Sequence, residues 1–195
     1  ITGRNRERGE AAAAAIDGDV RFIQADMADL ASIAALVEQH SRVDILVNNA
    51  ATFPGAMTVD QDVASFESTF DTNVRGTYFL VAGLVPGMLD RGYGSIVNVT
   101  SMVASKGVPG ASVYSASKAA VESLTRTWAA EFGPRGVRVN TVAPGPTNTE
   151  GVVAEWGDTN ADLGRTRPVG PTAEPAKIAR AARILASGAP YFRRL

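Results

Sequence analysis

The residues with the clearest chemical potential are Tyr114 and Lys118, four positions apart in the segment Tyr-Ser-Ala-Ser-Lys. At that spacing two side chains lie on the same face of a helix. A tyrosine phenol has a pKa near ~10, and a neighbouring ammonium group or the positive end of a helix lowers it. Such a tyrosine can donate a proton to a carbonyl oxygen or accept one from an alcohol. By itself this pair is weak evidence for catalysis, because a half-buried structural tyrosine near an exposed lysine has the same spacing.

Composition excludes several other kinds of site. The 195-residue chain has no cysteine and one histidine, His40, so disulfides, thiolate catalysis and Cys-based metal sites are ruled out. With a single histidine we expect no His-centred triad and no metal site. The formal net charge of -1 argues against a nucleic-acid partner. The longest apolar stretch, Tyr78–Leu89, is too short to span a bilayer. No signal peptide is recognised, so we expect no membrane partner and a cytoplasmic location.

The elements that must position these residues alternate between short apolar runs and longer helical runs, which is typical of a parallel sheet built from βαβ units. We expect strands over Val20–Ala25, Val43–Val47, Ser95–Val99 and Val137–Val142, after a first strand that ends at Thr2. We expect helices over Arg4–Ile16, Asp29–His40, Asp60–Leu89, Ala111–Phe132 and Ala173–Ser187, with Asp29 and Thr172 as caps. The nearly all-apolar run Val43–Val47 predicts a strand covered on both faces. Thr147–Pro171 is polar and irregular, and we expect it to form a mobile substrate loop or lid. The prediction is one α/β domain over residues 1–195, a Rossmann-like doubly wound parallel sheet.

Polar or turn residues follow each of the expected strands. They are Arg4, Asp26, Asn48, Ser101 and the pair Pro144-Gly145. The carboxyl ends of parallel strands share one edge of the sheet, where doubly wound folds bind their ligands. The alternative is that turns are polar in any protein, which accounts for Pro144-Gly145 better than for the others.

Taken together, the motifs resemble the classical short-chain dehydrogenase/reductase family, over nearly the whole chain from Ile1 to about Ser187. The residues that match in order and spacing are Asp26, Asn48-Asn49-Ala50, Asn73, Ser101, Tyr114-Ser-Ala-Ser-Lys118 and Pro144-Gly145-Pro-Thr-Asn-Thr149. The resemblance implies hydride transfer between nicotinamide and a carbonyl or alcohol. Within the family, the chain is similar to the 3-oxoacyl-carrier-protein reductases.

The same resemblance implies four catalytic residues. Tyr114 is the general acid/base, and Lys118 tunes it and binds the nicotinamide ribose. Ser101 hydrogen-bonds the substrate oxygen, and Asn73 holds a water that links Lys118 to solvent. For Ser101 the alternative is a strand-end serine that satisfies a turn, and for Asn73 a polar residue on an exposed helix face.

Cofactor residues follow from the same match. Arg4 stands where a guanidinium can pair with the 2′-phosphate of NADP, so NADP(H) is favoured over NAD(H). The resemblance places Asp26 and Met27 at adenine, and Asn48 and Ala50 at the adenosine ribose. It places the nicotinamide beside Pro144, Gly145, Thr147 and Thr149.

The chain departs from the family pattern in three places. Ala51 stands where glycine is usual, no Gly-rich phosphate turn is present, and the tail after Ser187 lacks the usual last strand. We therefore expect this chain to be a fragment that lacks the first β-α unit and the last strand. A different class of function stays open: a non-catalytic Rossmann-like dinucleotide-binding or assembly subunit, or an inactive relic.

A small-molecule carbonyl or alcohol is the expected partner. The residues expected around it are Met102, Val103, Val108, Pro109, Val152, Val153 and Trp156, whose apolar character suggests a hydrophobic substrate. The two long helices, Asp60–Leu89 and Ala111–Phe132, have more apolar surface than one sheet face needs. In the family these helices pair between subunits, so we expect a homodimer or homotetramer.

Overall fold

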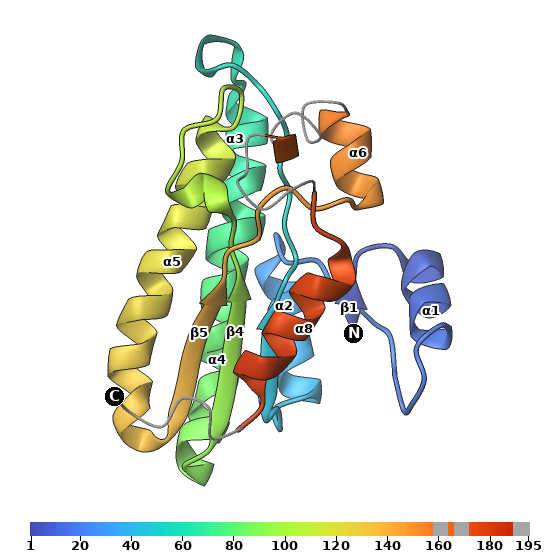
Figure 1. Cartoon of the computed structure of the whole chain (residues 1–195). Coiled ribbons are helices and arrows are strands. Elements are labelled where there is room, and N and C mark those ends of the chain that lie inside the picture. Colours follow the sequence, from blue (N-terminus) through green and yellow to red (C-terminus); the bar gives the residue numbers. More distant parts are fainter. Residues whose placement is uncertain (158–163, 166–171, 189–195) are drawn as a thin grey trace.

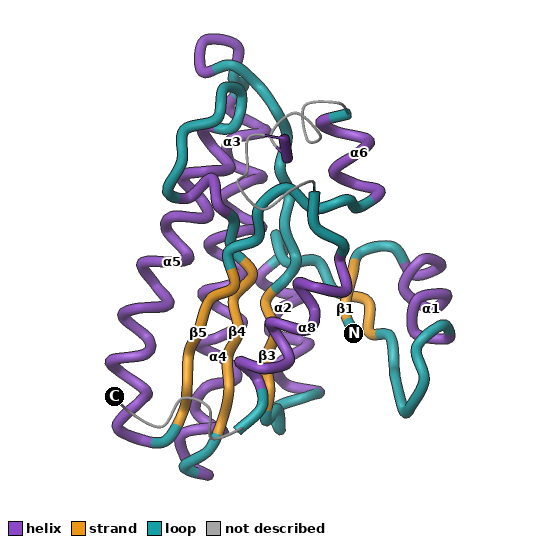
Figure 2. The backbone as a smooth tube through the Cα atoms, in the orientation of Figure 1, coloured by secondary structure: helices purple, strands orange, loops and turns teal. Residues whose placement is uncertain are grey.

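The strands run parallel in two hydrogen-bonded groups. A computed structural model of the chain describes residues 1–157, 164–165 and 172–188 (Figures 1 and 2). Strand β1 (Thr2–Gly3) pairs with β2 (Ile23–Gln24), and the order β3-β4-β5 joins β3 (Ile45–Asn48), β4 (Gly94–Val99) and β5 (Val137–Val142). The expected α/β Rossmann-like fold is confirmed. Among the described residues, the two groups are not joined by hydrogen bonds between strands.

Helices cover the strands on two sides. The described α-helices are α1 (Arg6–Ala14), α2 (Leu30–Gln39), α3 (Val63–Phe70), α4 (Thr77–Arg91), α5 (Ser112–Phe132), α6 (Glu150–Trp156) and α8 (Pro175–Ala186). In Figure 1, α4 lies behind the three-stranded group, α5 stands at its left beside β5, and α8 crosses its front. Helix α2 packs against α4. One core cluster joins Val81 and Met88 of α4 to Ile96 of β4 and Trp128 of α5. On the opposite face, Val97 packs against α8.

Strand β3 is less covered than its sequence indicates. Ile45 and Val47 are each 46% exposed, while Leu46 packs against the core. The prediction that this run is covered on both faces is therefore wrong for the described residues. The reason is local: α8 packs against β4 and β5, and no described helix covers the outer face of β3.

The long crossover is not one helix. A 3-10 turn (Thr58–Asp60) precedes α3, and a π-helical turn (Asp71–Gly76) connects α3 to α4. Pro86 lies inside α4, which continues to Arg91. The helix ends there because Gly92 adopts a left-handed conformation, with φ of 66°, and closes the last turn.

Several local predictions need correction. Asp29 caps α2 as expected, through a 2.9 Å bond from the Ala31 N–H to its carboxylate. Thr172 does not cap α8; Glu174 holds that position, and Pro175 starts the helix without needing an N–H partner. The segment expected to be irregular contains α6, because the Thr149 hydroxyl accepts from the Val152 N–H and starts a helix. Residues 158–163 and 166–171 of that segment lie outside the described residues.

Gly76 fixes where α4 approaches the loop after β2. A Cβ atom at this position would collide with the carbonyl oxygen of Met27. The backbone of the π-helical turn can therefore contact the Met27 backbone only because residue 76 has no side chain. This contact joins the crossover to the loop that carries Asp26.

We expect Gly76→Ala to lower the free energy of unfolding by about 1–3 kcal/mol, because two backbone segments must move apart. Gly107→Ala is the matched control, since a Cβ there meets no atom within 4 Å. Urea unfolding of the two variants checks this. Equal stabilities would show that the contact does not constrain the fold.

Candidate active site

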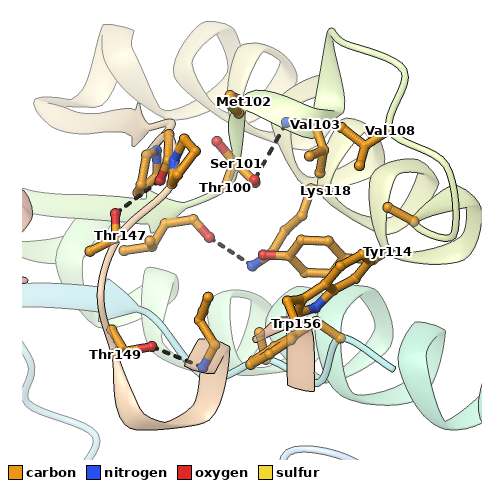
Figure 3. Close-up of a pocket in the computed structure, with 18 of the residues that line it drawn as sticks. Thr100, Ser101, Met102, Val103, Val108, Tyr114, Lys118, Thr147, Thr149 and Trp156 are labelled. Atoms are coloured by element: carbon orange, nitrogen blue, oxygen red, sulfur yellow. Dashed lines mark hydrogen bonds between the residues drawn. The ribbon is translucent and has the colours of Figure 1, made fainter. Parts of the chain in front are cut away.

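Tyr114, Lys118 and Ser101 line one cavity of about 530 Å³ (Figure 3). Tyr114 and Lys118 lie near the start of α5, and Ser101 follows β4. The other sides of this cavity come from the segments after β3 and β5 and from α6. The lining residues are Asn49, Ala50, Ala51, Phe53, Val99, Thr100, Ser101, Met102, Val103, Val108, Ala111, Tyr114, Lys118, Pro144, Gly145, Pro146, Thr147, Thr149, Val152 and Trp156.

Lys118 is buried beneath this cavity. Its Nζ donates a 2.8 Å hydrogen bond to the carbonyl oxygen of Val99 and lies 5.6 Å from the centre of the Tyr114 ring. Lys118 as a whole is only 4% exposed. Burial lowers the pKa of Lys118 to about 8, because the ammonium group has lost most of its water. The lysine therefore keeps its charge at neutral pH.

Tyr114 differs from the expectation in the direction of its pKa. Burial raises the pKa of Tyr114 above its usual value, and a hydrogen bond with Ser101 acts in the opposite direction but more weakly. The net direction is therefore opposite to the one expected from the lysine and the helix end. Loss of water around the phenol outweighs the Ser101 hydrogen bond, so the phenol holds its proton at neutral pH.

Ser101 begins a short 3-10 turn (Met102–Ala104). Its backbone is extended, and its Oγ accepts from the Val103 N–H at 3.4 Å, which is a long hydrogen bond. The serine does satisfy a turn, as the alternative proposed, and it also faces the cavity that Tyr114 lines. Both descriptions of this residue hold together.

Asn73 lies in the π-helical turn and is 1% exposed, so the alternative of an exposed helix face is wrong. Its Oδ1 accepts from the Thr52 N–H at 2.9 Å, and its Nδ2 donates to the Thr52 carbonyl at 2.9 Å. The same Nδ2 donates to Ser117 Oγ at 3.0 Å, and Ser117 donates to the Tyr114 carbonyl at 2.7 Å. The side chain therefore ties the loop after β3 to the first turns of α5. Its role in a proton relay stays a prediction.

Asn48 takes part in a second buried polar network, which holds the strands. Its Nδ2 donates to Asn98 Oδ1 at 2.8 Å, and Asn98 Nδ2 donates to Thr125 Oγ1 at 2.8 Å. Asn98 is fully buried in β4. Three elements, β3, β4 and α5, are therefore held in register by one chain of side-chain hydrogen bonds.

The residues expected at the nicotinamide do share the cavity with Tyr114. Pro144, Gly145, Thr147 and Thr149 all line it. Ala50, which was expected at the adenosine ribose, lines the same cavity. The Pro144 carbonyl accepts from the Met102 N–H at 2.8 Å, which fixes the loop after β5 against the turn that carries Ser101.

A second cavity of about 420 Å³ lies at the ends of β1 and β2. Arg4 and Asp26 line it, as do Arg6, Gln24, Ala25, Asp29 and Ser32. Asp26 accepts from the Ala28 N–H at 2.9 Å. Met27, Asn48 and Asn73 line neither cavity, and the Met27 side chain is buried in the core with Ala25 and Ile33.

Several residues that line these sites or support them were not singled out from the sequence, among them Phe53, Arg6 and Asn98. The ring centre of Phe53 lies 5.9 Å from that of Tyr114. The only hint in the sequence was that a large aromatic residue occurs in a loop. Arg6 lies in the second cavity and donates to Gln24 at 3.0 Å. Asn98 had a usable signal, because it is a polar residue within an apolar strand.

Among the described residues, no group of three His, Asp or Glu side chains is arranged to hold a metal ion. Likewise, none of the described helices is both long and apolar enough to cross a membrane.

Comparison with known proteins identifies the family to which the chain is similar. A family model described as "Enoyl-(Acyl carrier protein) reductase" matches residues 1–192. The 2-keto-3-deoxy-L-fuconate dehydrogenase of Xanthomonas campestris is 37% identical over 86% of this chain, which spans 58% of that relative's length. A structure described as a putative betaketoacyl-ACP reductase is 59% identical, covers 96% of this chain and 78% of its own, and has a TM-score of 0.88.

A third comparison is with a putative NAD(P)-dependent gluconate 5-dehydrogenase from Beutenbergia cavernae, solved with bound NADP at low occupancy. It is 33% identical with a TM-score of 0.87, and the match covers 95% of this chain and 78% of its own. The family model covers nearly the whole chain, and the motifs around Ser101, Tyr114 and Lys118 lie together in one cavity. The chain therefore belongs to the classical short-chain dehydrogenase/reductase family, whose members are oxidoreductases.

Proposed function

We propose that this protein transfers a hydride between NADP(H) and a small carbonyl or alcohol substrate, with Tyr114 as the general acid/base. The observation that carries the proposal is the cavity in which Ser101, Tyr114 and Lys118 converge at the end of β4. A phenol, a hydroxyl and a buried ammonium group at one site provide a proton donor, a second hydrogen-bond donor and a fixed positive charge.

The residues of the chain have separate tasks in this reaction. A bound nicotinamide cofactor supplies or accepts the hydride. Ser101 Oγ and Tyr114 Oη bind the substrate oxygen, and Tyr114 Oη donates its proton to that oxygen as the carbonyl is reduced. Because burial keeps the phenol protonated, Tyr114 is prepared to act as an acid. The ammonium group of Lys118 stabilises the phenolate that remains.

The two cavities suit the two ends of a dinucleotide. Small residues, Ala50, Ala51 and Gly145, line the cavity near Lys118 and leave room for a flat ring. The second cavity has two guanidinium groups, Arg4 and Arg6, beside Asp26. Arginine pairs well with phosphate, which favours NADP(H) over NAD(H). The bound NADP in the gluconate 5-dehydrogenase structure supports the same choice.

Assembly into a homodimer or homotetramer is also proposed. Tyr78 and Phe79 of α4 are 44% and 46% exposed, and Phe66 of α3 is 45% exposed. Such a group of apolar side chains on one long helical segment fits burial by a second copy of the chain. A cytoplasmic location remains a prediction.

Tyr114→Phe should lower kcat for reduction by about 10²–10⁴-fold, because the general acid is lost. NADPH affinity should remain close to wild type. Tyr93→Phe is the control, since Tyr93 is 49% exposed and lies outside the cavity. NADPH oxidation at 340 nm measures both variants. Wild-type turnover in the Tyr114 variant would remove the proposed mechanism and favour a non-catalytic role.

Arg4→Ala should raise the KM for NADPH by about 10–100-fold, because one charge-assisted hydrogen bond to the phosphate is lost. The KM for NADH should change little, because NADH has no 2′-phosphate. Arg42→Ala, an exposed arginine outside both cavities, is the control. An equal loss for both cofactors would contradict the assignment of Arg4 to the 2′-phosphate.

Stability should rise with pH above 8 because of Lys118. Its pKa is about 8 in the folded protein, against 10.5 for an ordinary lysine. Between these values the unfolded chain binds the extra proton, so the free energy of unfolding increases with pH. The raised pKa of Tyr114 opposes this only above pH 10, because there the unfolded chain loses its phenolic proton first.

We expect a gain on the order of 1–3 kcal/mol between pH 8 and 10. Lys118→Met should remove it, and Lys106→Met, an exposed lysine, should retain it. Urea unfolding at several pH values is the measurement. A wild-type stability that falls over this interval would show that Lys118 is not buried as a cation.

A further inference from the structure

Trp156, at the end of α6, packs against two glycines, Gly55 and Gly110. The six-membered ring of Trp156 lies so close to the backbone of Gly55 that a Cβ there would be 3.4 Å from the indole. A Cβ at Gly110 would be 3.9 Å from the same ring. A 3.0 Å hydrogen bond from the Ala56 N–H to the Gly110 carbonyl holds these two glycine segments together. The indole therefore packs against the backbone of both glycine segments at van der Waals distance, and these two segments form the notch that holds it.

The residue before the tryptophan is also fixed. Glu155 Oε1 accepts a 2.9 Å hydrogen bond from the Gly55 N–H. Helix α6 ends directly after Trp156, because Gly157 adopts a positive φ of 47°. Adjacent side chains thus attach the end of α6 to the loop after β3, and Trp156 lines the same cavity as Tyr114 (Figure 3).

The part of the cavity around Tyr114 is apolar. Phe53 lies with its ring centre 5.9 Å from that of Tyr114, and Val103, Val108 and Val152 line the same space. Among the described lining residues, Lys118 is the only one with a charged side chain, and its Nζ is bonded to the Val99 carbonyl. No described cation in this chamber is therefore available to pair with a carboxylate or phosphate on a substrate.

We propose that Trp156 determines specificity by closing this chamber, so that the enzyme acts on compact, uncharged ketones and secondary alcohols, with an alicyclic ring as the best fit. The inference rests on the proposed function. A ring packs against Phe53 and the indole, whereas an extended chain must displace Trp156 from its notch. A thioester carried on a phosphopantetheine arm is both long and charged, so this geometry does not favour it.

Kinetics with three matched ketones test the inference: cyclohexanone, its anionic analogue 4-oxocyclohexanecarboxylate, and the extended 2-octanone. We expect wild-type kcat/KM with NADPH to be at least about tenfold higher for cyclohexanone than for the other two. Trp156→Ala should raise the 2-octanone-to-cyclohexanone ratio about tenfold or more. Trp156→Phe should change the ratio less, because a ring still fills the notch. Val153→Ala should leave it unchanged. Contrary to the expectation from the sequence, Val153 does not line the cavity, and it is 55% exposed on the same helix.

A ratio that stays within twofold in Trp156→Ala, or a wild-type preference for the anion, would overturn the inference while NADPH oxidation still supports the proposed function. A measurement of ketone binding separates the specificity inference from the proposed function. Saturation-transfer NMR with NADP+ present reports ketone binding without turnover, and we expect the same order of ligands and the same shift in Trp156→Ala. That selectivity without any NADPH oxidation would overturn the proposed function alone. Absence of selectivity in both measurements would overturn the inference.

Discussion

The hydrogen bond from Lys118 to the Val99 carbonyl is the interaction on which the site depends. It places a buried ammonium group at the end of β4 without a carboxylate partner among the described residues, and burial lowers its pKa to about 8. An unpaired buried charge is costly. A fold that retains it must hold α5 and β4 in fixed positions, and those two elements carry Tyr114 and Ser101.

Two polar networks provide that rigidity. Asn73 bonds to both backbone groups of Thr52 and to Ser117, which in turn bonds to the backbone of Tyr114. Asn98 joins β3 to α5 through its own amide. Buried hydrogen-bonded amides of this kind make a core rigid and favour one arrangement of it. Tyr114 is therefore positioned by residues that lie outside the cavity.

Much of this could be predicted from the sequence. The periodicity of Leu30–Gln39 and the spacing of Tyr114 and Lys118 are local, and the structure has α2 and α5 there. The family motifs brought Ser101, Tyr114 and Pro144 to one site because parallel strands end at one edge. The pKa direction of Tyr114 was not predictable, because it depends on how many neighbours remove its water. Phe53 and the Trp156 notch were equally hidden, since they depend on the paths of loops separated by about half of the chain. The break of the crossover into a π-helical turn arises from tertiary contacts of Asn73 and Gly76, which no helical periodicity reveals.

In the proposed reaction, hydride moves directly between nicotinamide C4 and the substrate carbon at this cavity. Reduction of cyclohexanone with NADPH deuterated at C4, in separate preparations for each face, tests this step most directly, with mass spectrometry of the alcohol. We expect one of the two preparations to place deuterium on the carbinol carbon and to slow the hydride step. Alcohol that contains no deuterium from either preparation would contradict it.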